Sequence, residues 1–371
     1  MLRKLSLPLL AIFSLSQATE VTISGVMSAD IENNLDASWK AHNSANQDIT
    51  LTTRAQFDEK AAVELYITNY STVTDSATGV TRASVVRSVE PGRSAEVANP
   101  NSRWGTLAFD GIQFQWEFLR KAKLLVGDMT YYGGSMNYYG YRWTQEYGTI
   151  LKETYLRGLG FDLGGDGQIY VGAPDANNSA VWGYAGYSIP ILKRTDEKFM
   201  IRPMGDLVFK NGGRQNRWTL GAETQYSRSI SSNLNYGVSG AWGMIPYQNK
   251  STHTFLVEPS IGYKEFSLAG TYYQALPSNK DSSIALQTSI PEEQFVSIEP
   301  SFSPHPKFSF GLGGEFHNPN KRIKGDDYFA TVPTFYLYPA EKMSITFWTK
   351  YQWMMQAADV VKLGLSSEVK F

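Results

Sequence analysis

The sequence predicts an all-β protein whose strands close into a transmembrane antiparallel up-and-down β-barrel. Apolar residues recur at every second position in many segments of about ten residues, the length of a tilted strand that crosses a bilayer. Short and long connections mostly alternate along the chain. Charged residues in the alternating segments fall on the polar positions, as expected if the other face meets lipid.

The alternation gives each predicted strand one apolar face and one polar face, because successive side chains of a strand point to opposite sides. It is clearest at 21–32, 233–244, 307–317, 343–353 and 360–371. In the last segment the apolar positions are Val361, Leu363, Leu365, Val369 and Phe371, and the intervening positions include Lys362, Glu368 and Lys370. One lipid-facing and one water-facing side would account for this pattern.

The connections favour a barrel over a secreted β-sandwich, which would explain the alternation but not the asymmetry of the loops. Short turns are predicted at 58–60, 119–121, 164–167, 192–198, 227–232, 303–307 and 339–342. Long loops are predicted at 33–47, 71–102, 132–150, 245–253, 276–293 and 318–328. Short periplasmic turns and long extracellular loops are typical of outer-membrane barrels.

A sheet inside hydrocarbon must close on itself, because every backbone polar group there needs a partner. We expect an even count of about 16–18 strands, with 18 preferred. Asp110-Gly111 is either a hairpin turn or a bulge within one strand.

The N-terminal residues predict export from the cytoplasm. Arg3 and Lys4 precede an apolar run that ends near Ser16-Gln17-Ala18, the layout of a signal peptide at residues 1–18. The run is shorter than the about 20 residues of a membrane-spanning helix, which disfavours the alternative of a membrane anchor. Residues 19–371 are then a single barrel domain.

Composition and motifs exclude several classes of function. The chain has 34 Lys and Arg against 35 Asp and Glu, too balanced to indicate a nucleic-acid partner. It has no Cys, and its four His show no metal-ligand spacing. The GGDG at 164–167 lacks the Lys-Ser/Thr of a phosphate-binding loop. We therefore expect neither an enzyme nor a bound cofactor or metal.

The stretch from Asp359 to Phe371 resembles the C-terminal assembly signal of bacterial outer-membrane barrels, although Ser367 interrupts its apolar series. With the signal peptide and strand number, the whole chain resembles the porins of Gram-negative bacteria. The resemblance implies a location in the lipid of the bacterial outer membrane and insertion by the outer-membrane assembly machinery, with Phe371 as the assembly signal. It also implies a homotrimer as one assembly, because many porins are trimers.

A barrel of this size leaves an aqueous lumen unless it is plugged, and two loops carry candidate constriction residues. They are Arg82, Arg87, Glu90 and Arg93 in 71–102, and Tyr138, Tyr139, Tyr141, Arg142 and Trp143 in 132–150. Aromatic rings can lie against the apolar faces of sugars, so a sugar-guiding constriction is one interpretation. The alternative is that these rings pack the loop or lie at the outer lipid boundary.

The alternation also predicts charged side chains in the lumen. The candidates are Arg157, Arg202, Asp206, Arg217, Glu223, Glu258, Glu315 and Lys350. Both signs of charge occur, so we expect weak charge selectivity.

The sequence thus predicts a porin, a passive diffusion channel for small hydrophilic solutes, with sugars among them. The alternative is a surface barrel without a channel, whose long loops act in adhesion, polymer binding or envelope structure. Stepwise conductance in planar bilayers distinguishes the two.

Overall fold

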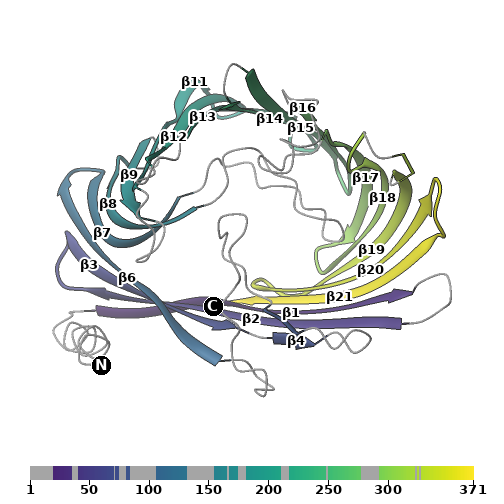
Figure 1. The fold of residues 1–371 in the computed structure, drawn as a ribbon, viewed down its shortest axis with the longest axis horizontal. Helices are drawn as coiled ribbons and strands as arrows, with labels where there is room; N and C mark the ends of the chain where they lie inside the picture. Colours follow the sequence, from purple (N-terminus) through teal and green to yellow (C-terminus); the bar gives the residue numbers. More distant parts are fainter. Residues whose placement is uncertain are drawn as a thin grey trace.

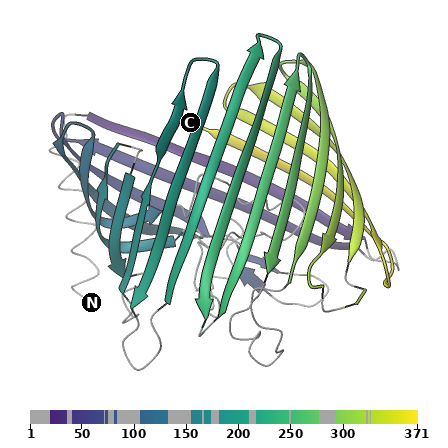
Figure 2. The same ribbon diagram turned by 90° about the horizontal axis from the view of Figure 1, so that it is seen from above.

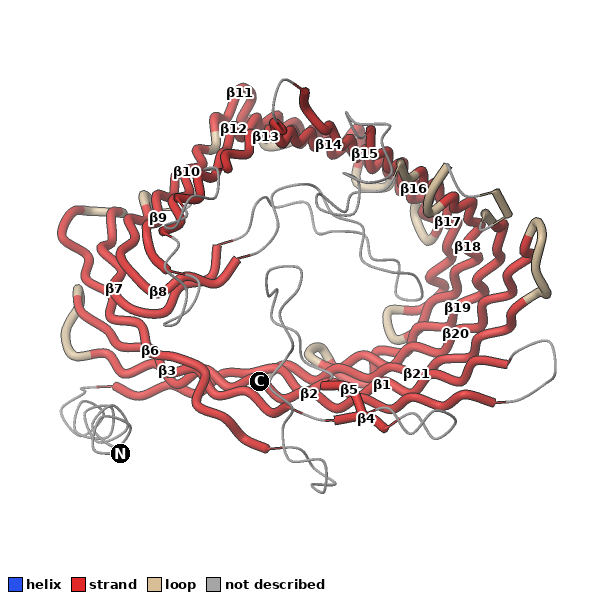
Figure 3. Tube along the Cα trace, in the orientation of Figure 1, coloured by secondary structure: helices blue, strands red, loops and turns tan. Residues whose placement is uncertain are grey.

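The computed structural model describes residues 20–35, 41–70, 72–74, 81–83, 106–131, 154–164, 167–173, 181–209, 217–247, 250–276, 292–321, 324–325 and 327–371. The described residues are strands and the turns between them (Figure 3). Among them, no helix has the length and apolar character needed to span a membrane.

The strands alternate with short turns along most of the chain. Their bounds are β1 Glu20–Leu35, β2 Ala41–Gln56, β3 Ala61–Tyr70, β4 Thr72–Thr74, β5 Thr81–Ala83, β6 Thr106–Leu119, β7 Ala122–Tyr131, β8 Thr154–Asp162, β9 Gly167–Ala173, β10 Val181–Tyr187, β11 Ile189–Lys193, β12 Glu197–Phe209, β13 Arg217–Ser231, β14 Leu234–Tyr247, β15 Lys250–Tyr263, β16 Phe266–Leu276, β17 Gln294–His305, β18 Phe308–Asn318, β19 Tyr328–Ala340, β20 Met343–Met354 and β21 Val360–Lys370.

The main sheet closes on itself. Each strand pairs antiparallel with its neighbour in sequence order, and β1 pairs with both β2 and β21. Strands β10 and β11 lie one after the other along β12 and form a single position in the ring. The result is a closed barrel of 18 strands, as the sequence predicted, with β4 and β5 as a separate small hairpin.

The ring is flattened along one side (Figure 1). Strands β1, β2 and β21 lie side by side in a nearly flat wall, and β9 to β18 form an arch opposite. Viewed from above, the strands are tilted, and β1 and β2 cross obliquely behind the strands of the arch (Figure 2). Tilt and stagger of this kind are what closing a sheet into a barrel requires.

The two faces of the wall differ as the alternation predicted. On β18, Phe310 and Leu312 point outward and are 47% and 56% exposed, whereas Ser309 and Glu315 point inward and are buried. Outward-facing residues of the other strands repeat this pattern, for example Ile298 and Phe347. A large apolar outer surface is what a wall immersed in lipid requires.

Two clusters of buried side chains pack on the inner face of the ring, and a third, of Val63, Leu65 and Ile112, shares the outward alternation of Phe114. One inward cluster lies on β7 to β12, made of Leu125, Met129, Leu156, Tyr170, Trp182, Tyr184 and Met204. A second cluster of Leu256, Tyr273, Ala275, Phe295, Val332 and Trp348 extends from β15 to β20. The inner wall is consequently a mixture of aromatic, apolar and charged patches.

Three local features refine the sequence predictions. The loops expected at 33–47 and 245–253 are largely strand. In the first, β1 continues to Leu35 and β2 begins at Ala41; in the second, β14 continues to Tyr247 and β15 begins at Lys250. Polar residues at both odd and even positions of these segments hid the alternation. At Gly111 the register of β6 against β3 shifts, so this stretch is a bulge within one strand rather than a hairpin turn.

Candidate functional site: the lumen wall

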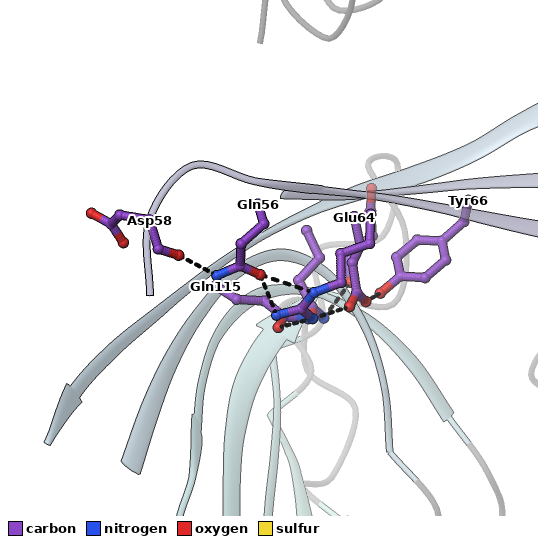
Figure 4. Close-up of polar contacts among 8 residues, drawn as sticks. Gln56, Asp58, Glu64, Tyr66 and Gln115 are labelled. Atoms are coloured by element: carbon purple, nitrogen blue, oxygen red, sulfur yellow. Dashed lines mark hydrogen bonds and ion pairs between the residues drawn. The ribbon is translucent and has the colours of Figure 1, made fainter. Parts of the chain in front are cut away.

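A polar network around Arg54 lines the inner face of β2, β3 and β6 near the short turns. Arg54 pairs in register with Glu64, and its Nη1 donates to Glu64 Oε1 at 2.7 Å and to Gln115 Oε1 at 3.0 Å. Its Nε and Nη2 both donate to Gln56 Oε1, at 3.2 and 3.0 Å. Figure 4 shows Gln56, Glu64 and Gln115 converging on the guanidinium, with the Tyr66 hydroxyl donating to Glu64.

This geometry fastens three strands together across the wall. Each guanidinium nitrogen of Arg54 already donates to a neighbour, so little hydrogen-bonding capacity remains for a passing solute. Gln56 is itself held, because its Nε2 donates to the carbonyl of Asp58 in the following turn. The Arg54 side chain is still 36% exposed, so its charge contributes to the field inside the lumen.

A second network links the inner faces of β18, β19 and β20. Lys350 Nζ donates to Glu315 Oε2 at 2.5 Å and to the Tyr328 hydroxyl at 3.1 Å, and it lies 4.8 Å from the Tyr328 ring centroid. Both charged side chains are 0% exposed. His317 continues the network, with Nδ1 3.3 Å from the Tyr328 hydroxyl and Nε2 2.7 Å from Glu293 Oε1.

A third group lies on β9, β10, β12 and β13. Arg202 Nη2 donates to Gln168 Oε1 at 3.0 Å and to the Tyr184 hydroxyl at 3.3 Å. The Tyr184 ring stacks on Tyr170 at 6.1 Å between centroids. Glu223 lies opposite Arg202 in the register of β12 and β13 and is buried. Charge of both signs thus alternates with aromatic rings on this part of the wall.

The structure places only some of the predicted pore residues. Arg82 lies in β5, where its backbone pairs with Val73 of β4. Arg217 begins β13 opposite Val208, and Glu223 faces inward on the same strand. The remaining constriction candidates lie outside the described residues: Arg87, Glu90, Arg93, Tyr138, Tyr139, Tyr141, Arg142 and Trp143.

Most of the lumen charges predicted by alternation do face inward, and one does not. Arg202, Asp206, Glu258, Glu315 and Lys350 lie on inner-facing positions. The prediction for Arg157 was wrong, as it shares its strand face with the exposed outer residues Leu159 and Phe161.

Arg157 instead forms an ion pair beside an irregularity in the sheet. Its Nε donates to Asp128 Oδ1 at 2.6 Å, and Asp128 Oδ2 accepts from the backbone N–H of Ile112 at 2.8 Å. The preceding Gly127 has φ of 117°. The sequence misled here because Leu156 and Leu159 put leucine on both alternations of β8.

Sequence reasoning did not single out Arg54, Glu64 and Gln115. A signal was present, since Arg54 and Gln56 occupy alternate positions of one predicted strand and Glu64 and Tyr66 of the next. The alternation predicts that these side chains face water, but not that they meet. Their contact depends on the register between β2, β3 and β6.

Phe371 follows β21 and completes the seam of the ring. Its backbone N–H donates to the Gly25 carbonyl and its carbonyl accepts from the Gly25 N–H, both at 3.1 Å. The Phe371 side chain is 42% exposed on the outer wall. In the described part of the chain, no group of three or more His, Asp or Glu side chains could hold a metal.

Comparison with known proteins gives a match in structure only. The sequence matches no protein-family model and no curated protein. The fold resembles crystal structures of the Pseudomonas aeruginosa proteins OpdQ (7% identity, TM-score 0.59) and OpdL (7%, 0.58), each with 95% of this chain and 99% of that chain covered. It also resembles OccK5 (OpdH) of the same organism, at 8% identity and TM-score 0.57, with coverage of 96% and 99%.

These neighbours are outer-membrane porins of the OprD/Occ group, and at this identity the likeness concerns architecture. It agrees with the ring closure, the strand count and the apolar outer wall described above. The chain therefore has the fold of an outer-membrane porin, a closed antiparallel barrel of 18 strands.

Proposed function

We propose that this protein is an outer-membrane porin, a passive diffusion channel for small hydrophilic solutes. The observation that carries the proposal is the closed ring itself, with an apolar outer face and charged side chains on its inner face. A barrel of this strand number is wide enough to leave an aqueous passage. The structural likeness to porins supports the same function.

We expect weak charge selectivity with a small preference for cations. Two inward cations, Arg54 and Lys350, are already paired with Glu64 and Glu315. Glu258 lies on the inner face of β15, and its Oε1 has no hydrogen-bond partner among the residues that the structure describes. Carboxylate charge in a pore wall favours cations, whereas internal pairing limits the size of the effect.

Sugars are the solute class that we put forward for the narrowest part of the channel. The tyrosines that motivate this choice lie in 132–150, and rings of this kind can contact the apolar faces of a sugar. The same proposal includes a signal peptide at 1–18, insertion by the outer-membrane assembly machinery and assembly as a homotrimer.

The test is a planar-bilayer recording of the refolded protein, first in salt alone and then with a panel of sugars. We expect stepwise conductance, a small reversal potential of cation-selective sign in a salt gradient, and partial block by sugars that fit. A bilayer that stays silent with folded protein would instead favour the surface barrel without a channel. Conductance that no sugar blocks would contradict the choice of sugars as solutes but not the proposal of a diffusion channel.

A further inference from the structure

The outer wall carries an apolar groove of about 610 Å³ where β18, β19, β20, β21 and β1 lie side by side. One side of the groove is a row of outward residues that follows the strand register. Phe310 pairs with Phe335, Phe335 with Phe347, Phe347 with Leu365, and Leu365 with Ile31. The ring centroids of Phe310 and Phe335 are 5.1 Å apart, so this side is a continuous ridge.

The floor of the groove comes from the next outward positions on the same strands. They carry the short side chains of Pro333 and Thr349, with Leu363 beside them on β21. These short side chains project less far from the wall than the neighbouring rings, so a trough lies beside the row of rings. None of the described residues that line the groove is charged.

The groove opens outward, not into the lumen. Phe310 and Phe347 are 47% and 45% exposed on the outer face. Eight of its twelve lining residues hold outward positions, and the other four, Gly311, Thr334, Trp348 and Gly364, lie between them along the same strands. In a membrane this face meets hydrocarbon, where an empty trough loses dispersion contacts that a close-fitting chain would restore.

The level of the groove on the wall selects one leaflet. Phe347 lies a few residues into β20 from the turn that holds Lys342, and Leu365 lies at the same height on β21 above Lys370. At about 3.3 Å rise per residue along a tilted strand, the ridge is roughly 10 Å from those lysines. The apolar belt of such barrels is about 25 Å tall, so the groove lies in the half next to the short turns.

We propose that this groove is a binding site for an acyl chain of a phospholipid in the periplasmic leaflet. The lipid headgroup would lie at the level of Lys342 and Lys370, where charged side chains end the apolar wall. A second copy of this chain is the other occupant to consider, but Phe310 and Phe347 project from the wall and would hold a flat partner away from the floor. Phospholipid is also present at high concentration in that leaflet, which favours its binding by mass action.

The test is native mass spectrometry of the purified full-length barrel in detergent, titrated with dipalmitoyl phosphatidylethanolamine. The variant Thr349→Phe fills the floor of the groove, and the control Thr224→Phe adds the same bulk on the outer face of β13. We expect the groove variant to retain bound phospholipid about threefold less than the wild type and the control. Dihexanoyl phosphatidylethanolamine, which has the same headgroup and short chains, should bind all three proteins weakly and equally.

Circular dichroism would first confirm that each variant is folded, with Thr349→Leu as a smaller replacement if Thr349→Phe is not. Equal retention of the long-chain lipid by wild type and groove variant would overturn the proposal. So would oligomers that hold no lipid and dissociate in the groove variant, because the occupant would then be a second copy.

Discussion

Gly25 and Phe371 exchange two backbone hydrogen bonds of 3.1 Å, and the ring of Phe371 lies against the position where Gly25 has no side chain. A Cβ at residue 25 would lie 2.5 Å from the Thr50 carbonyl oxygen and 3.0 Å from Phe371 Cζ. The seam between the first and last strands therefore depends on close approach at a glycine.

The variant Gly25→Ala tests this seam. The added methyl group must displace backbone, so we expect a loss of about 1–3 kcal/mol in the free energy of unfolding, measured in detergent by urea titration. Gly314→Ala is the matched control on the outer face of β18, because a Cβ there would make an ordinary 3.7 Å contact with Ile298. Equal effects of the two substitutions would show that the seam is not tightly packed.

Phe371→Ala separates assembly from stability. The side chain is 42% exposed, so its removal should cost less than about 1 kcal/mol in the refolded protein. If Phe371 is an assembly signal, the yield of the variant in the outer membrane of cells should nevertheless fall severalfold. Unchanged yield in cells would contradict that role.

The buried ion pair of Lys350 and Glu315 gives a third prediction. Lys350→Met leaves a carboxylate buried without its cation, and we expect a loss of about 3–5 kcal/mol in the free energy of unfolding. The double variant Lys350→Met with Glu315→Leu should recover most of it, because neither charge then remains. The exposed pair of Lys370 and Glu368, 3.0 Å apart, is the control, and Lys370→Met should have no measurable effect. A double variant as unstable as the single one would argue against this account.

Arg54 gives a prediction for conduction. Arg54→Ala removes a cation from the inner wall and leaves Glu64 without its ion-pair partner, so single-channel conductance and the preference for cations should both rise. Arg228→Ala is the matched control, because Arg228 is exposed and shares the outward alternation of Leu220 on β13. A reversal potential in a salt gradient measures the selectivity, and equal shifts in the two variants would show that the lumen position of Arg54 is irrelevant.

The carboxyl of Glu293, just before β17, makes the stability of the fold depend on pH. Burial raises its pKa above the ordinary value of 4.5, and the hydrogen bond with His317 opposes the rise. Because the folded-state pKa lies above that of the unfolded chain, the stability linked to Glu293 is complete below the ordinary value and is lost as pH rises through the raised one.

Unfolding midpoints measured as pH rises from below 4.5 through the raised pKa should therefore decline less in Glu293→Gln than in the wild type. Glu265→Gln, in the exposed turn between β15 and β16, is the control and should follow the wild-type curve. A Glu293→Gln curve parallel to that of the wild type would count against the assignment.

The sequence determined which face of most strands is the apolar outer one, because strand alternation is a local property of two successive residues. Phe310 and Leu312 face outward and Ser309 and Glu315 inward, as their spacing predicts. The same reasoning led to a closed barrel, since an apolar face of this extent excludes an open edge in lipid. It failed at Arg157, where leucines on both alternations removed the signal and an irregular sheet set the contacts.

Only the tertiary structure decided which of the inward side chains meet. Arg54 and Gln115 are 61 residues apart in sequence and lie 3.0 Å apart across β2, β3 and β6. Glu315 and Lys350 meet because β18, β19 and β20 pair in one register, and a slip of one residue would send their side chains to the other face. Register is a property of the whole closed ring, whereas alternation is a property of each strand alone.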